Sequence, residues 1–177
     1  NGQRATNAPP ICSLGILLSA MWRLSLLILL TISSAPGRVE ENVVYGMRSG
    51  LALLMDVHYP EQSNGRGIVF IPGSGWHAPL DYDATPLKAS GFAKLWAPPL
   101  VEAGYTLFVI NHRAAPRFQH PAALEDAQRA VRFVRANAEL YGIDPERIGG
   151  VGGSSGGHLI AMLGVVDAPG TLPPMTL

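Results

Sequence analysis

The stretch "GVGGSSGGHL", residues 150–159, places two adjacent serines between pairs of glycines. It fits the pattern G-x-S-x-G in two frames, with either Ser155 or Ser154 as the central serine. In this pattern a sharp turn between a strand and a helix exposes the serine hydroxyl, and small neighbours avoid clashes. The second glycine after the pattern and the apolar run that starts "HLIAML" favour Ser155 as the nucleophile, with Ser154 as a small spacer.

The context of the motif supports a catalytic turn over other glycine-rich loops. A short apolar run, "RIGGVGG" at residues 147–153, precedes the serines and predicts a strand buried on both faces, while a helix-forming run follows them. No lysine follows the glycines as a phosphate-binding P-loop requires, and Ser155 occupies the third glycine position of G-x-G-x-x-G. The remaining alternative is a glycine-rich turn with a structural role alone.

Upstream of the motif, the sequence predicts further strands. "GIVFIPG" (residues 67–73) and "YTLFVIN" (105–111) are continuous apolar runs, typical of strands buried on both faces of a parallel sheet. "VVYG" and residues 51–60 predict an antiparallel hairpin that turns at Ser49-Gly50. Together these segments predict an α/β fold with a mostly parallel sheet, an N-terminal antiparallel hairpin and crossover helices.

Residues 121–142 predict the longest helix. Its apolar positions recur at intervals of three and four, which forms one stripe, and Gly142 is suited to closing the last turn. The stripe consists of Leu124, Ala127, Val131, Val134 and Ala138.

Composition places the chain among ordinary globular proteins. Of the 177 residues, 47% are hydrophobic and 15% charged, which suffices to bury the core of one domain. Thirteen basic and thirteen acidic side chains give no net charge, so the charge balance does not indicate a nucleic-acid partner. The five histidines have no metal-ligand spacing such as H-E-x-x-H, and we predict neither a metal nor another cofactor.

The N-terminal region resembles an export signal. "MWRLSLLILLTISSAPG", residues 21–37, combines an early arginine, an apolar core and small residues before a possible cut after Ala35. We expect an upstream segment at residues 1–20, a removable signal at 21–35, and the N-terminal part of one domain at 36–177, in a secreted or periplasmic protein. The alternative is a membrane anchor over residues 11–32, in which Arg23 would cost at least ~2.5 kcal/mol within the membrane.

Residues 67–166 resemble the first half of an α/β-hydrolase of the esterase/lipase group that includes hormone-sensitive-lipase-like and feruloyl- or acetylxylan-esterase-like enzymes. "FIPGSGW" resembles the loop that reads H-G-G-G-W in this group. The block "NHRAAPRFQHPAALEDAQRAVRFVRANAELYGIDPERIGGVGGSSGGHL" resembles the run from Y-R-L-A-P through the P-A-x-x-x-D helix to G-x-S-A-G-G-H-L. The resemblance implies an incomplete α/β-hydrolase sandwich.

The resemblance also implies site residues. Ser155 would be the nucleophile, and the backbone N–H groups of Ser74, Gly75 and Gly156 would form the oxyanion hole. Pro72 stands where the group usually has a histidine that helps to fix the conformation of this loop. Ser74 replaces a glycine.

Other polar and aromatic side chains are expected to have structural roles. Arg113 and Asp126 are expected to form an ion pair or helix-end contacts. His158 lies too close to Ser155 to act as its base, and Trp76 and Trp96 are expected in the core.

In this fold the catalytic residues follow the order Ser, then Asp or Glu, then His. After Ser155 the sequence contains one acid, Asp167, and one histidine, His158, in the wrong order. We therefore expect the acid and the base beyond residue 177, and a polypeptide ending there to be close to inactive. We also expect it to be poorly stable, because its last strand would have an unpaired edge.

The sequence thus predicts a serine hydrolase of carboxylic esters, acting on a small-molecule or carbohydrate ester, with membrane association only through the signal or anchor. Two alternatives stay open. One is a non-catalytic binding protein or remnant on a hydrolase scaffold, and the other is a peptidase of the prolyl-oligopeptidase type.

Overall fold

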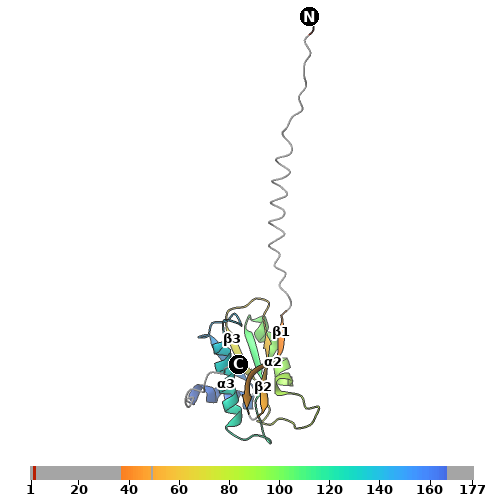
Figure 1. The fold of residues 1–177 in the computed structure, drawn as a ribbon, viewed down its shortest axis with the longest axis vertical. Helices are drawn as coiled ribbons and strands as arrows, with labels where there is room; N and C mark the ends of the chain where they lie inside the picture. The colour runs from red at the N-terminus through yellow and green to blue at the C-terminus, as the bar shows by residue number, and fades with distance from the viewer. Residues whose placement is uncertain (1, 3–36, 49, 167–177) are drawn as a thin grey trace. The chain divides into compact units, whose positions relative to one another are not determined.

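The computed structural model describes residue 2, residues 37–48 and residues 50–166. Within this part, five strands form one mixed sheet in the order β1-β2-β4-β3-β5 (Figure 1). The strands are β1 (Val39–Arg48), β2 (Leu51–His58), β3 (Gly67–Ile71), β4 (Thr106–Ile110) and β5 (Ile148–Gly152). The pairs β1/β2 and β2/β4 are antiparallel, whereas β3 pairs in parallel with both β4 and β5. The predicted α/β class with its N-terminal hairpin is confirmed.

Helices cover both faces of this sheet. The described elements are a short 3-10 helix, η1 (Leu87–Ala89), and the helices α2 (Gly91–Glu102), α3 (Ala122–Ala136) and α4 (Ser155–Val165). In Figure 1, α2 lies on one side of the strands and α3 on the other. The three layers therefore enclose two apolar interfaces, one on each face of the sheet.

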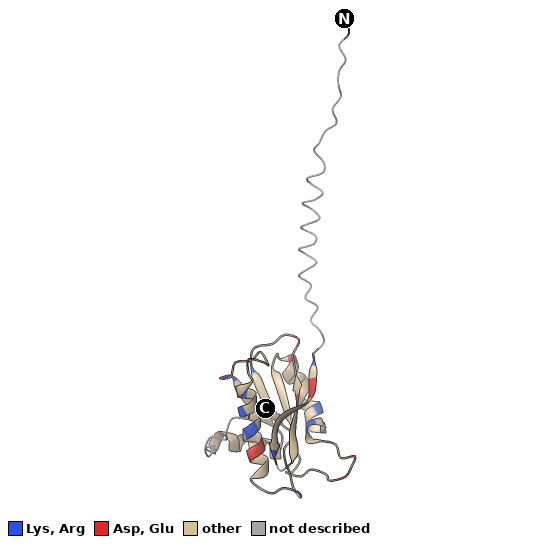
Figure 2. Ribbon diagram, viewed as in Figure 1, with Lys and Arg blue, Asp and Glu red and all other residues tan. Residues whose placement is uncertain are grey.

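The two central strands explain how the core is divided. Every residue of β3 and β4 is buried, and Figure 2 shows these strands without charged residues. Side chains alternate between the faces of a strand. In β3, Val69 and Ile71 accordingly join the cluster that includes residues of α3 and α4, while Ile68 and Phe70 join the cluster that includes residues of α2.

Strand β5 differs from the buried strand that its apolar run predicts. Gly149 and Gly150 are exposed, and β5 is the last strand in the order of the described sheet, paired there with β3. Its glycines bury little because they have no side chains. The prediction of a strand is confirmed, but the prediction that it is buried on both faces is wrong for the described part of the chain.

The helices also depart from the sequence-based expectations. The helix expected over residues 121–142 ends at Ala136, and Gly142 lies in a later turn with a φ of 64°. Helix α2 was not expected, because it contains Pro98 and Pro99 and prolines disfavour helix interiors.

A buried ion pair joins β2 to η1. The Lys88 Nζ lies 2.6 Å and 2.7 Å from the two carboxylate oxygens of Asp56. No motif connects these two residues, which are 32 positions apart in the sequence. The pair fixes the start of the segment that leads into α2.

The expected export signal at 21–35 lies outside the described residues, as does the upstream segment at 1–20 apart from residue 2. Both stay predictions, as does the membrane anchor over residues 11–32. In the described part of the chain, no helix has the length and apolar character that crossing a bilayer demands.

Candidate active site

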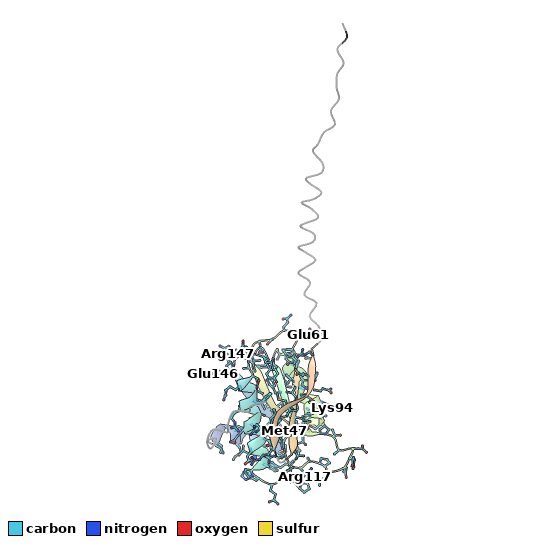
Figure 3. The ribbon with its side chains drawn as sticks, in the orientation of Figure 1. Met47, Glu61, Lys94, Arg117, Glu146 and Arg147 are labelled. Atoms are coloured by element: carbon cyan, nitrogen blue, oxygen red, sulfur yellow. The ribbon has the colours of Figure 1, made fainter. Side chains whose placement is uncertain are left out.

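The candidate site lies where the parallel strands end. Glu146 and Arg147 precede β5, whereas Arg117 follows β4, and Figure 3 shows Arg117 at the opposite end of the sheet from the other two. Because β3, β4 and β5 run parallel, the loop after β3, the segment after β4 and the turn after β5 all leave the end of the sheet at which Arg117 lies. In open α/β sheets, ligands bind at the carboxyl ends of the strands.

Ser154 occupies the turn between β5 and α4. Its backbone has a φ of 50° and a ψ of −121°, a conformation that non-glycine residues rarely adopt, and its side chain is exposed. Among the described residues, its hydroxyl has no hydrogen-bond partner. A strained strand-to-helix turn that presents a serine to solvent is the geometry of a nucleophile elbow.

The glycines around Ser154 make this turn sterically possible. A Cβ atom on Gly152 would overlap the backbone of Gly156, and a Cβ atom on Gly156 would overlap the carbonyl oxygen of Ile71. The first turn of α4 thus packs directly on the end of β3, backbone against backbone. Side chains larger than hydrogen at these two positions would force the elbow open.

Ser155, the serine expected to be the nucleophile, has a different environment. It is the first residue of α4, its exposure is 2%, and its Oγ accepts a hydrogen bond of 2.9 Å from the N–H of Ser74. A hydroxyl buried in this way is not presented to a substrate. The exposure of Ser154 and the burial of Ser155 favour Ser154, the central serine of the other frame of the motif, as the candidate nucleophile.

The predicted oxyanion donors also differ in their environments. The N–H of Gly156 already donates to the carbonyl of Gly153 at 2.8 Å, so it does not point to a developing oxyanion. The N–H of Ser155 follows Ser154 directly, which is the position of the elbow's donor, and it has no partner among the described residues. The N–H of Ser155 is therefore a better candidate for this role than the N–H of Gly156.

The loop after β3 contains the other two predicted donors, Ser74 and Gly75. A Cβ atom on Gly73 would lie 3.1 Å from the Ser154 Cβ, so the loop passes close to the elbow. The Ser74 N–H already donates to the Ser155 Oγ, so it is engaged in the same way as the Gly156 N–H, while the N–H of Gly75 has no partner within the described residues. The loop thus lies next to the elbow, with Pro72 in the position where the resemblance implies a histidine.

The far side of the loop is attached to the segment after β4. The N–H of Ala115 donates to the Trp76 carbonyl at 2.8 Å, and the N–H of Ala78 donates to the Ala115 carbonyl at 2.9 Å. Trp76 has a φ of 60°. The loop is thus anchored at both of its sides, by Ser155 on one and by Ala115 on the other.

Trp76 and His158 line an apolar cavity beside the elbow. Their rings meet edge to face with centroids 5.4 Å apart, and the cavity has a volume of about 260 Å³. The cavity is also lined by Phe118, Gln119, His120, Ala123, Leu124, Leu159, Met162 and residues 113–115. Trp76 and Trp96 are each 47% exposed, so the prediction that they lie in the core is wrong.

Arg113 and Asp126 form the expected structural ion pair. Both are buried, and Arg113 Nη2 lies 2.8 Å from Asp126 Oδ1, while the Arg113 N–H donates to Oδ2 at 2.8 Å. Hydrogen bonding to Asp126 raises the pKa of the Arg113 guanidinium, so this group stays charged. The pair connects the segment after β4 to α3.

Within residues 37–48 and 50–166, no three His, Cys, Asp or Glu side chains lie close enough together to hold a metal ion. The chemistry that the elbow and the loop after β3 offer is that of an exposed serine near backbone N–H donors.

Comparisons with known proteins agree with this geometry. Bovine arylacetamide deacetylase (Bos taurus) is 30% identical over 73% of this chain and 32% of its own length. An acetylxylan esterase of Xylanibacter ruminicola is 32% identical over 61% of this chain and 21% of its own length. The solved structure of a truncated carbohydrate esterase from gut microbiota is 34% identical with a TM-score of 0.63, over 82% of this chain and 49% of that one.

These relatives are carboxylic-ester hydrolases, and this chain spans a third or less of the curated ones. The structural neighbour confirms the partial α/β-hydrolase fold. Residues 55–172 match the family described as BD-FAE. The chain therefore belongs to the BD-FAE family, which is of the α/β-hydrolase type.

Proposed function

We propose that this chain supplies the nucleophile and the oxyanion hole of a serine hydrolase of carboxylic esters, with Ser154 as the nucleophile. The observation that carries the proposal is the exposed Ser154 hydroxyl on a strand-to-helix turn with a φ of 50°. The proposed oxyanion donors are the N–H of Ser155, in the same turn, and the N–H of Gly75, in the loop after β3; neither has a partner among the described residues.

In the proposed reaction, the Ser154 Oγ attacks the ester carbonyl carbon and loses its proton to a general base. The carbonyl oxygen becomes an oxyanion that the N–H groups of Ser155 and Gly75 stabilise. Collapse of this intermediate breaks the bond to the alcohol, which leaves with the proton, and water then hydrolyses the acyl-enzyme.

The general base is proposed to come from a segment of the whole protein after residue 177. His158 is the one histidine after Ser154 in this sequence, and its ring packs against Trp76. Because this chain spans 32% of the bovine relative, there is room for an acid and a histidine in the remainder of such a protein. A polypeptide limited to these residues would be close to inactive.

The substrate is proposed to be a small-molecule or carbohydrate ester. The cavity beside Trp76 is lined mainly by apolar side chains and suits a small apolar group of the substrate. The printed names of two relatives, an acetylxylan esterase and a truncated carbohydrate esterase, support an ester on carbohydrate.

The proposal is tested by Ser154→Ala and Ser155→Ala in the protein as its gene encodes it, with p-nitrophenyl acetate as the substrate. Removing a serine nucleophile lowers kcat on the order of 10⁶-fold. Ser154→Ala should therefore abolish both hydrolysis and labelling by a fluorophosphonate probe. In the labelled wild-type protein, mass spectrometry should locate the probe on Ser154.

A probe found on Ser155 would instead support the serine expected from the sequence. Hydrolysis that survives in Ser154→Ala would end the proposal. A whole protein that neither hydrolyses esters nor reacts with the probe would favour a binding protein on a hydrolase scaffold.

A further inference from the structure

Ser155 makes a hydrogen bond that the proposed reaction does not use. Its Oγ accepts the N–H of Ser74 at 2.9 Å, across 81 positions of sequence. The bond is part-buried, because Ser155 is 2% exposed and Ser74 is half-buried. It joins the start of α4 to the loop after β3, the two elements that contribute the proposed oxyanion donors.

This part of the loop has few other attachments. Pro72 has no N–H group, and the buried hydroxyl of Ser74 has no partner among the described residues. The hydrogen bonds to Ala115 hold the opposite side of the loop, at Trp76 and Ala78. Among the described residues, the bond from Ser74 to Ser155 is the one direct hydrogen bond between the loop and the elbow.

We propose that Ser155 is a positioning residue for the oxyanion hole and that it acts through its side-chain hydroxyl. By accepting the Ser74 N–H, it holds the Ser74-Gly75 turn against the elbow and sets the distance between the Gly75 N–H and the N–H of Ser155. The inference rests on the proposed function, since it concerns the same site. It assigns a role to the Ser155 side chain that is separate from the nucleophile and from the Ser155 N–H.

The effect of this positioning should appear in the transition state. The oxyanion exists only after attack on the carbonyl, so a displaced donor weakens the transition state more than the bound substrate. Loss of an entire oxyanion donor lowers kcat by about 10²- to 10³-fold. A donor that is displaced while still present should cost less, roughly 10- to 100-fold in kcat, with KM nearly unchanged.

The experiment compares Ser155→Ala with Ser63→Ala in the whole protein. Alanine removes one oxygen and adds no atoms, so it introduces no steric clash at the buried position. Ser63 is a matched control, because its Oγ also accepts a backbone N–H, that of Gly65 at 3.1 Å, but in an exposed loop outside the site. The Ser63 variant should keep the kcat and KM of the wild type.

Three measurements separate positioning from a general loss of structure. Labelling with a fluorophosphonate gives the active fraction, so that kcat is expressed per active site. Hydrolysis of p-nitrophenyl acetate gives kcat and KM. Inhibition by phenylboronic acid, which forms a tetrahedral adduct on the nucleophile, reports on the oxyanion hole; its inhibition constant should rise in Ser155→Ala by a factor similar to the fall in kcat.

A second variant, Ser155→Cys, keeps the shape of the side chain but offers a weaker acceptor, and its kcat should lie between those of the wild type and the alanine variant. An unchanged kcat in Ser155→Ala would overturn the inference. So would a higher kcat, which would mean that the hydroxyl competes with the oxyanion for the Ser74 N–H. These results leave the proposed function standing as long as Ser154→Ala is inactive.

Discussion

At the scale of single residues, His112 is a buried group whose charge state the fold controls. Its Nδ1 lies 3.0 Å from the carbonyl oxygen of Arg113, and its Nε2 is buried without a partner among the described residues. The carbonyl can only accept, so Nδ1 carries the proton of the neutral ring. Burial lowers the pKa of His112, and the Arg113 carbonyl and the Asp126 carboxylate oppose this shift more weakly.

This burial predicts a loss of stability in mild acid. As the pH falls below about 6.5, His112 takes up a proton in the unfolded state but not in the folded state, which favours unfolding. The loss grows until the pH reaches the lower pKa of the folded protein. Urea unfolding at pH 7.0 and 5.5 should therefore show a smaller decrease in the free energy of unfolding for His112→Gln than for the wild type.

The matched control for this measurement is His120→Gln, because the side chain of His120 is exposed. This variant should keep the decrease that the wild type shows. A decrease of the same size in His112→Gln and the wild type would contradict the prediction.

The two serines show what the sequence can and cannot decide at this scale. Both frames of G-x-S-x-G fit, so the motif predicts an elbow without assigning its serine. The assignment depends on exposure and backbone conformation, which place Ser154 in the turn and Ser155 inside the helix. The ion pair of Arg113 and Asp126, by contrast, was predicted correctly, whereas the pairing of Lys88 with Asp56 has no local signal in the sequence.

At the scale of elements, the contact between the first turn of α4 and the end of β3 requires glycine. Gly156→Ala would place a methyl group onto the carbonyl oxygen of Ile71, which cannot move without breaking the end of the strand. We expect this variant to destabilise the protein by roughly 3 kcal/mol. Denaturant unfolding measures the loss directly.

Gly164, on the same helix, is the control for this substitution. A Cβ atom there would have no other atom within 4 Å. Alanine is favoured over glycine in helices by about 1 kcal/mol, so Gly164→Ala should leave stability unchanged or raise it slightly. Equal losses in the two variants would show that the contact with β3 is not the cause.

The elements that the sequence predicted best are those with continuous apolar runs. Strands β3 and β4 lie within the predicted ranges because both are buried on two faces. Helix α2 was not predicted from the sequence, because its second half contains two prolines. The burial of Ala93 and Ala97 in the core stabilises the helix by more than the prolines destabilise it. The burial of β5 was overestimated because its apolar run consists largely of glycine.

At the scale of the whole molecule, we propose that residues 21–35 direct export and are then removed. The proposal rests on the early Arg23, the apolar core and the small residues before Ala35 in the sequence. Expression in a host with a secretory pathway should yield a protein whose N-terminal sequence begins at Pro36. Ala35→Phe should prevent this cut, because the position before the cleavage site requires a small residue.

Recovery of a membrane-bound protein that retains residues 21–35 would support the anchor over residues 11–32 instead. Export without cleavage in both the wild type and Ala35→Phe would contradict the proposed cleavage site.

The backbone-to-backbone contacts around the elbow have a consequence for changing this protein. Because Gly152 and Gly156 pack against main-chain atoms, the position of Ser154 depends little on which apolar side chains fill the core. If Ser154 is the nucleophile as proposed, libraries that vary the lining of the cavity beside Trp76 should alter substrate preference while the Ser154 hydroxyl keeps its place. The few glycines of the elbow are the positions that such a library should leave untouched.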